Sequence, residues 1–341
     1  MSRALLLTLL ALASTAAIGA EDPAAMLMRM SEAARDANYQ GVIVYRTQDR
    51  LETLKVVHGV REGAEIERIQ TLTGAPSEIV KLNGRVICLL PKDRRLTLDR
   101  PTPKGLFPVL SKERVAQLMT MYDFEAIGAA RVAGRQCNGL AITPKDELRY
   151  GYRIWADAET GVPLKVNLVG REGRVLEQMM FTEVDFPEQL PDAVFDTEAD
   201  RARAASAAQP PQPQAAVDAR DVPEASWQFR ELPPGFRVAM RERRLTADGA
   251  GVIDHVLLTD GLTAISVFSA YREASAPSFQ GQSRMGAVHA FGRMLGTFHI
   301  TVVGEAPPET VRMIGESVQP PAREPTTGPG PGPGPGPREP R

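Results

Sequence analysis

The sequence contains little of the chemistry from which most enzyme active sites are built. Its 341 residues include only four histidines and two cysteines. It has no Cys-x-x-Cys pair, His-Glu-x-x-His motif, Walker loop, Gly-x-Gly-x-x-Gly turn or Gly-x-Ser-x-Gly nucleophile elbow. These absences argue against a thiol-redox centre, a zinc site, a nucleotide pocket and a serine hydrolase. We therefore expect no catalytic residue, no metal and no cofactor, and a protein that is not an enzyme.

An excess of charge of one sign is also lacking. The 40 Lys and Arg residues nearly balance the 42 Asp and Glu residues, which leaves a net charge of −2. A surface that binds nucleic acid needs a strong basic excess, so no nucleic-acid partner is expected. After the first twenty residues, no apolar run approaches the ~18 residues that a membrane-spanning helix needs. We expect a chain that does not span a membrane.

The first twenty residues have the organisation of a secretory signal peptide. Arg3 supplies positive charge, an apolar run follows over 4–12, and small residues lead to Ala20. An N-terminal membrane anchor is the alternative. Export would place Cys88 and Cys137 in an oxidising compartment, where one disulfide can form. A bridge requires Cα atoms within about 7 Å, so a disulfide and two buried thiols both stay open.

Residues 21–187 are expected to form one α+β domain. Asp22-Pro23 is a helix start, and apolar residues at helical spacing predict an amphipathic helix over 22–38. Short strands follow, and Asn83-Gly84 has the composition of a type I′ hairpin turn. Such a succession predicts an antiparallel meander. If this sheet is curved, helices cover one face and the other forms a concavity.

A proline-rich loop over 99–110 and a short helix over 111–119 carry a cluster of apolar side chains. Methionines adapt to irregular ligands such as acyl chains, which makes this cluster a candidate lipid pocket. Core packing is the alternative. The candidate residues are Leu106, Phe107, Val109, Leu110, Leu118, Met119 and Met121.

The rest of the chain divides by composition. Proline and alanine predict an extended linker over 188–223, and the alternating Gly-Pro run predicts a disordered tail over 321–341. Residues 224–320 between them are expected to form a small mixed α/β domain. Large aromatic side chains can anchor an interface, and the guanidinium group of arginine matches carboxylate or phosphate. The candidate partner-binding residues are Trp227, Phe229, Arg241, Arg243 and Arg244. The alternatives are a solvated strand edge for the arginines and docking of the linker for the two aromatic residues.

Several segments together resemble the RseB/MucB family of periplasmic regulators of the sigma-E envelope-stress response. The segments run in the same order through both domains and cover about residues 22–320. They are 39–45 (YQGVIVY), 152–157 (YRIWAD), 160–165 (TGVPLK), 176–182 (LEQMMFT), 226–227 (SW), 232–236 (LPPGF), 257–268 (LLTDGLTAISVF) and 302–311 (VVGEAPPETV).

The resemblance implies a fold and a function. The large domain would be a curved antiparallel half-barrel with helices, similar to LolA and LppX, followed by the small domain. The protein would be a periplasmic negative regulator that binds the periplasmic part of a single-span anti-sigma factor, RseA or MucA. Bound there, it would shield that factor from the site-1 protease DegS until lipid or lipopolysaccharide releases it. A homo-oligomer stays open.

Two other functions compete with the regulator. The half-barrel alone would suit a periplasmic lipid or lipoprotein carrier, but a carrier hardly needs residues 224–320. An exported hydrolase on an unfamiliar scaffold is the third, and no motif supports it.

Overall fold

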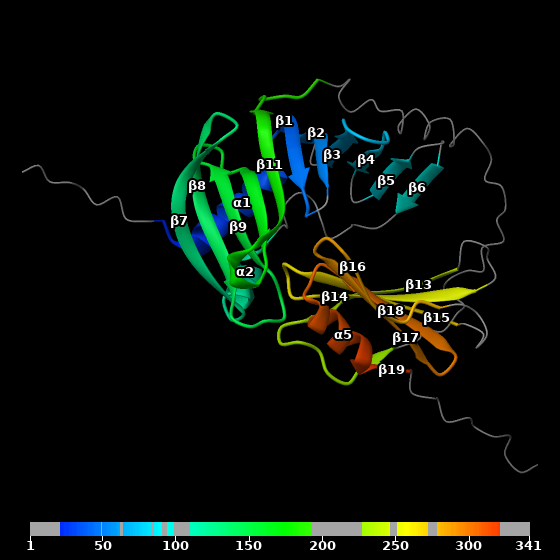
Figure 1. Ribbon diagram of the computed structural model, residues 1–341. Coiled ribbons are helices and arrows are strands. Elements are labelled where there is room, and N and C mark those ends of the chain that lie inside the picture. The colour runs from blue at the N-terminus through cyan, green and yellow to red at the C-terminus, as the bar shows by residue number, and fades with distance from the viewer. Residues whose placement is uncertain are drawn as a thin grey trace, which may run out of the picture.

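Three antiparallel sheets, of eleven, six and two strands, make up the described part of the computed structural model (Figure 1). It describes residues 21–48, 50–61, 64–82, 85–90, 94–98, 110–191, 227–245, 251–271 and 278–320. The predicted signal peptide, most of the linker and the Gly-Pro tail therefore lie outside the described residues, as do Leu106, Phe107, Val109 and the Asn83-Gly84 turn.

The N-terminal part contains an eleven-stranded sheet in the order β6-β5-β4-β3-β2-β1-β11-β10-β9-β8-β7. Its elements are α1 (Pro23–Asp36), β1 (Tyr39–Arg46), β2 (Leu51–Arg61), β3 (Ala64–Thr71), β4 (Glu78–Leu82), β5 (Arg85–Leu90), β6 (Arg94–Leu98), α2 (Lys112–Leu118), β7 (Tyr122–Val132), β8 (Arg135–Pro144), β9 (Gly151–Asp157), β10 (Pro163–Val169), η1 (Arg171–Gly173) and β11 (Val175–Asp185). Every neighbouring pair is antiparallel, which confirms the predicted α+β class.

Helix α1 begins as its sequence predicts and organises the curvature of the sheet. The Asp22 side chain accepts a hydrogen bond from the backbone N–H of Ala25 at 3.3 Å, and Pro23 occupies the first turn. The helix contacts both β2 and β7, although six positions of the sheet order separate these strands. The sheet must therefore curl around α1, and the buried Leu27 and Met30 fill its concave side.

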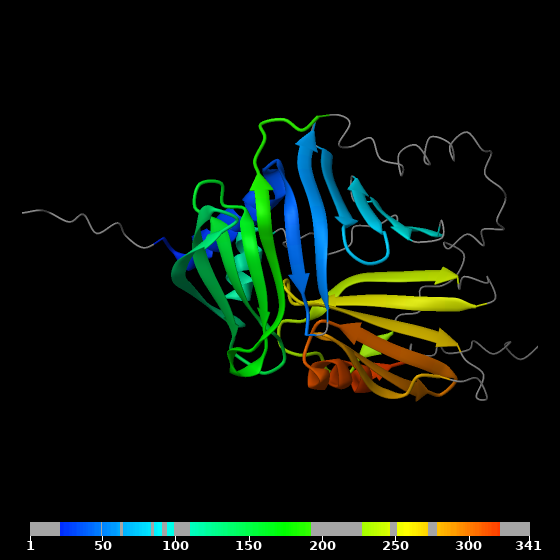
Figure 2. The ribbon, with the colours of Figure 1, turned by 45° about the horizontal axis from the view of Figure 1, so that its top comes forward.

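The C-terminal part contains a six-stranded antiparallel sheet in the order β13-β14-β15-β18-β17-β16. Its elements are β12 (Gln228–Phe229), β13 (Arg237–Leu245), β14 (Val252–Thr259), β15 (Ala264–Tyr271), β16 (Gly281–Met285), β17 (Val288–Leu295), β18 (Phe298–Gly304), α5 (Pro308–Ser317) and β19 (Val318–Gln319). Helix α5 packs on β17 and β18. Figure 2 shows this sheet below the ends of β1 and β2, with α5 on its lower side.

The strands that the sequence did not predict lie mainly at sheet edges. Every residue of β16 is exposed, so it has no alternation of buried and exposed positions. Strand β7, at one edge of the eleven-stranded sheet, has six exposed residues among its eleven. An edge strand needs only one hydrogen-bonded neighbour and one buried stripe, which weakens the apolar pattern.

The two cysteines lie in distant strands. Cys137 on β8 is buried and its thiol is free, while Cys88 belongs to β5, and seven strands lie between β5 and β8 in the sheet order. The side chain of Cys88 lies outside the described residues. Because the thiol of Cys137 is free, this structure contains no bridge between the two residues.

Candidate binding site between the domains

The hairpin between β14 and β15 inserts into the N-terminal domain. Leu262 at its tip packs against the core cluster formed by α1, α2 and the strands β7–β9. Asp260 holds the turn, because its Oδ1 accepts hydrogen bonds from the N–H groups of Leu262 at 2.9 Å and Thr263 at 2.7 Å. The hairpin therefore presents a preformed apolar tip to the other domain.

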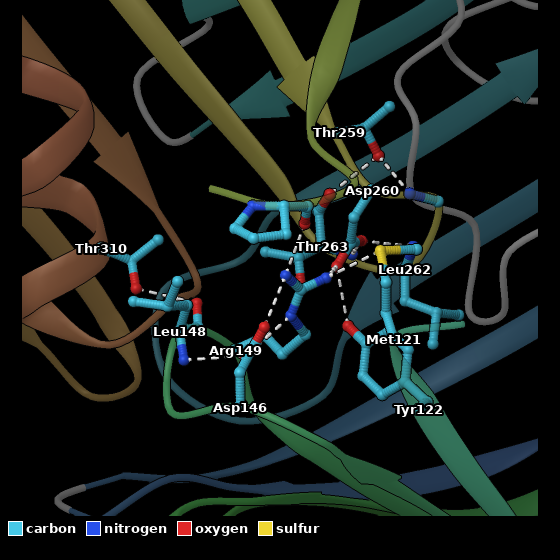
Figure 3. A network of polar contacts seen from close by, with 12 residues as sticks. Met121, Tyr122, Asp146, Leu148, Arg149, Thr259, Asp260, Leu262, Thr263 and Thr310 are labelled. Carbon is cyan, nitrogen blue, oxygen red and sulfur yellow. Dashed lines mark hydrogen bonds and ion pairs between the residues drawn. The ribbon is translucent and has the colours of Figure 1, made fainter. Parts of the chain in front are cut away.

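A buried ion pair joins the hairpin to the N-terminal domain (Figure 3). The Arg149 guanidinium donates to Asp260 Oδ2 at 2.8 Å, and the hydroxyl of Tyr122 donates to the same oxygen at 2.8 Å. Arg149 also donates to the carbonyl oxygen of Pro234 at 2.7 Å. Both charged side chains are 0% exposed. Breaking a buried pair of this kind is costly, because one charge is left without a partner.

The surroundings of Arg149 keep its side chain charged. Burial lowers the pKa of its guanidinium, but hydrogen bonding to Asp146 and the negative charge of Asp260 outweigh burial and raise the pKa overall. Its guanidinium also lies over the rings of Tyr122 at 5.5 Å and Phe236 at 5.4 Å, distances typical of cation–π contacts. Arg149 therefore carries its charge into the centre of the domain interface.

An apolar cavity of about 500 Å³ lies beside this hairpin. The N-terminal domain supplies most of the lining, and the hairpin supplies Thr259, Gly261, Leu262 and Ala264. Ile142 and Ile154 belong both to the lining and to the core cluster around α1. The cavity and the helix therefore share the concave face of the sheet, which corrects the expectation that the helices cover one face and the concavity lies on the other.

The charged side chains that line this cavity are acidic. Glu52, Glu177 and Glu305 line it, and the described residues of the lining include no lysine, arginine or histidine. The Tyr45 hydroxyl hydrogen-bonds to Glu177, and burial followed by this contact raises the pKa of the tyrosine. Glu177 also accepts from the N–H of Ala287 at 3.2 Å, which joins the two domains. The cavity suits an uncharged apolar chain better than an anionic group.

The candidate lipid residues that the structure describes do not line this cavity. Leu110, Leu118 and Met121 are buried in the core cluster with α1, and Met119 is 49% exposed. Core packing, the alternative for these residues, therefore describes three of them. Sequence reasoning missed the strand residues that do line the cavity, such as Tyr152, Ile154 and Leu168. The alternation of side chains along these strands indicates which face of the sheet is buried, but not whether that face encloses a cavity.

The described partner-binding candidates make contacts within the C-terminal domain. Trp227 is 1% exposed, and its indole N–H donates to Asp254 at 2.9 Å. Arg243 pairs with the same carboxylate, with N–O distances of 2.5 and 3.1 Å. Arg241 donates to the carbonyl oxygen of Trp227 at 2.8 Å. These contacts hold the segment that enters the domain.

The two other candidates are Phe229 and Arg244. Phe229 is half-buried against the core of the C-terminal domain, which agrees with the docking alternative. Arg244 pairs through its backbone with Ile253, and its side chain lies outside the described residues.

Within the part of the chain that the structure describes, no three His, Cys, Asp or Glu residues come together as metal ligands. In the same residues, no helix is both long and apolar enough to cross a membrane.

Comparison with known proteins shows the family. Residues 22–199 match the model of the MucB/RseB N-terminal domain, and residues 221–319 match that of the MucB/RseB C-terminal domain. The chain is 33% identical to the sigma factor AlgU regulatory protein MucB of Pseudomonas aeruginosa, over 93% of this chain and 97% of that protein. It is 26% identical to the sigma-E factor regulatory protein RseB of Escherichia coli, over 86% and 90%.

Solved structures agree with this assignment. The structure of the MucA/MucB complex of Pseudomonas aeruginosa matches with a TM-score of 0.69 and 29% identity, and covers 88% of this chain and 99% of that one. A structure of MucB in complex with MucA(peri) matches with a TM-score of 0.63 at the same identity and coverage. Both domains and the order of their segments match, and the chain belongs to the MucB/RseB family.

Proposed function

We propose that this protein is a periplasmic negative regulator of a sigma-E-type envelope-stress response. It binds the periplasmic segment of a single-span anti-sigma factor similar to MucA or RseA and shields that segment from site-1 proteolysis. The similarity extends through both domains, and two related structures contain MucB with MucA. We propose binding rather than catalysis as its activity.

We also propose that the cavity between the domains binds the acyl chain of a lipid or lipopolysaccharide and that this lowers affinity for the anti-sigma factor. The observation that supports this is the lining, which comes from both domains. A ligand that fits one domain arrangement better than another shifts the equilibrium by its difference in affinity. A partner that contacts both domains would respond to such a shift.

Calorimetric titration with the periplasmic segment of the cognate anti-sigma factor, with and without lipopolysaccharide, tests both proposals. We expect tight binding that lipopolysaccharide weakens. Ala264→Phe should fill the cavity and abolish the lipid effect without abolishing segment binding. Ala126→Phe adds the same ring at an exposed position of β7 and should behave as the unsubstituted protein.

Absence of segment binding would contradict the regulator proposal. If acyl chains nevertheless co-purified and moved to an acceptor membrane, the protein would be a lipid or lipoprotein carrier. Segment binding that lipopolysaccharide leaves unchanged would contradict only the lipid coupling. Sedimentation of the purified protein would determine whether it forms a homo-oligomer.

A further inference from the structure

A second cavity, of about 620 Å³, lies between the domains and is lined by a different set of side chains. It is bounded by the end of β1, the β10–β11 turn, the β16–β17 turn and the start of α5. Arg46 and Leu176 line it, whereas their chain neighbours Tyr45 and Glu177 line the apolar cavity. The two cavities therefore adjoin each other at the domain boundary.

Four arginines from both domains line this second cavity. Arg46, Arg171 and Arg174 come from the N-terminal domain and Arg284 from the C-terminal domain. The lining carboxylates are Glu172 and Glu309. Arg171 pairs with Glu147 at 2.9 Å, but the other three arginines have no carboxylate within 4 Å in the described part of the chain. The cavity therefore carries an excess of positive charge.

The arginines of the two domains act on the same side chain. Burial and the charge of Glu309 raise the pKa of Tyr150 to about 12, while Arg174 and Arg284 both act to lower it. Tyr150 also approaches His289, with 3.5 Å between its hydroxyl oxygen and Nδ1. Tyr150, Arg174 and Arg284 all line this cavity, so both domains place a positive charge near one tyrosine at the domain boundary. Like charges gathered in this way repel each other unless an anion lies between them.

We propose that this arginine-lined cavity is a binding site for a phosphate-bearing ligand. Guanidinium groups match phosphate oxygens in pairs of parallel hydrogen bonds. Three arginines without a carboxylate partner balance a multiply charged phosphate better than a single carboxylate. The apolar cavity, lined by three glutamates and no cation among its described residues, excludes the same group. A phosphate here would contact both domains, so it would stabilise the arrangement in which the arginines converge.

Calorimetric titration of the full chain with sodium pyrophosphate at low ionic strength tests this proposal. The site variant Arg46→Gln/Arg284→Gln removes one exposed arginine from each domain. The control Arg131→Gln/Arg237→Gln removes the same charge at exposed positions outside the cavity. We expect one pyrophosphate per chain, about tenfold or more loss of affinity in the site variant, and unchanged affinity in the control.

Two outcomes would overturn the proposal. One is that pyrophosphate does not bind. If a polyglutamate peptide then binds, the cavity is a site for an acidic peptide, and if neither binds, the cavity is not an anion site. The other is equal weakening in both double variants, which would reflect net charge only. Vesicles of phosphatidylcholine with phosphatidic acid distinguish the sources. Capture lost in the site variant alone assigns a lipid headgroup, and pyrophosphate binding without capture assigns a soluble phosphate. Neither outcome depends on the anti-sigma factor, so the two proposals fail separately.

Discussion

Among single residues, Asp157 shows how one carboxylate can make stability depend on pH. Burial acts to raise its pKa, but hydrogen bonds from Arg135 and Thr160 outweigh burial and hold the pKa below its ordinary value of 3.8. Arg135 donates at 2.6 and 3.0 Å, and Asp157 is 2% exposed. The folded state favours the ionised form, so the stabilisation is complete above pH 3.8 and is lost as the pH falls further.

We predict that Asp157→Asn lowers the free energy of unfolding by roughly 2 kcal/mol at pH 7. The difference from the unsubstituted protein should shrink as the pH falls from 3.8 through the lowered pKa of Asp157, because the carboxyl then becomes uncharged like the amide. Urea denaturation across this pH range measures it. Asp123→Asn is the control, since Asp123 is 73% exposed and its nearest cation is 3.4 Å away. A difference that stayed constant with pH would contradict the argument.

The free thiol of Cys137 leads to a second prediction at this scale. Titration of the unfolded, unreduced protein should find two thiols per chain, because the structure leaves Cys137 unbridged. The folded protein should react more slowly at Cys137, since its side chain is buried and burial raises the pKa of the thiol. Zero thiols would mean that Cys88 and Cys137 are bridged.

At the scale of elements, the turn of the β14–β15 hairpin is limited by its contact with α2. Gly261 has φ +113°, and a Cβ there would come within 2.8 Å of Cδ of Arg114. We predict that Gly261→Ala loosens the domain contact and lowers the melting temperature more than Gly296→Ala. Gly296 also has positive φ, at +60°, but has open space around its Cβ position. Equal effects would contradict the prediction, because both the φ of +113° and the contact with Arg114 should make position 261 the more sensitive one.

At the scale of the whole molecule, the Arg149–Asp260 pair connects the two domains. We predict that Arg149→Ala lowers the free energy of unfolding by about 3–5 kcal/mol, because Asp260 is left buried without its partner. The domains should also separate more readily, which small-angle scattering would detect as a larger radius of gyration. Arg171→Ala removes an exposed pair, with side chains 57% and 77% exposed, and should change neither quantity. A compact and fully stable Arg149 variant would contradict this role.

The sequence by itself determined much of the local structure and the family. Asp22-Pro23 starts α1, alternating apolar residues form most of the interior strands, and the pattern of segments indicates the family. Only the tertiary structure decided where the two cavities lie. Arg149 and Asp260 lie 111 positions apart, and Arg46 and Arg284 line one cavity only because the second domain docks on the end of the curled sheet. Local patterns report which face of an element is apolar, whereas a cavity depends on which faces the fold leaves incompletely covered.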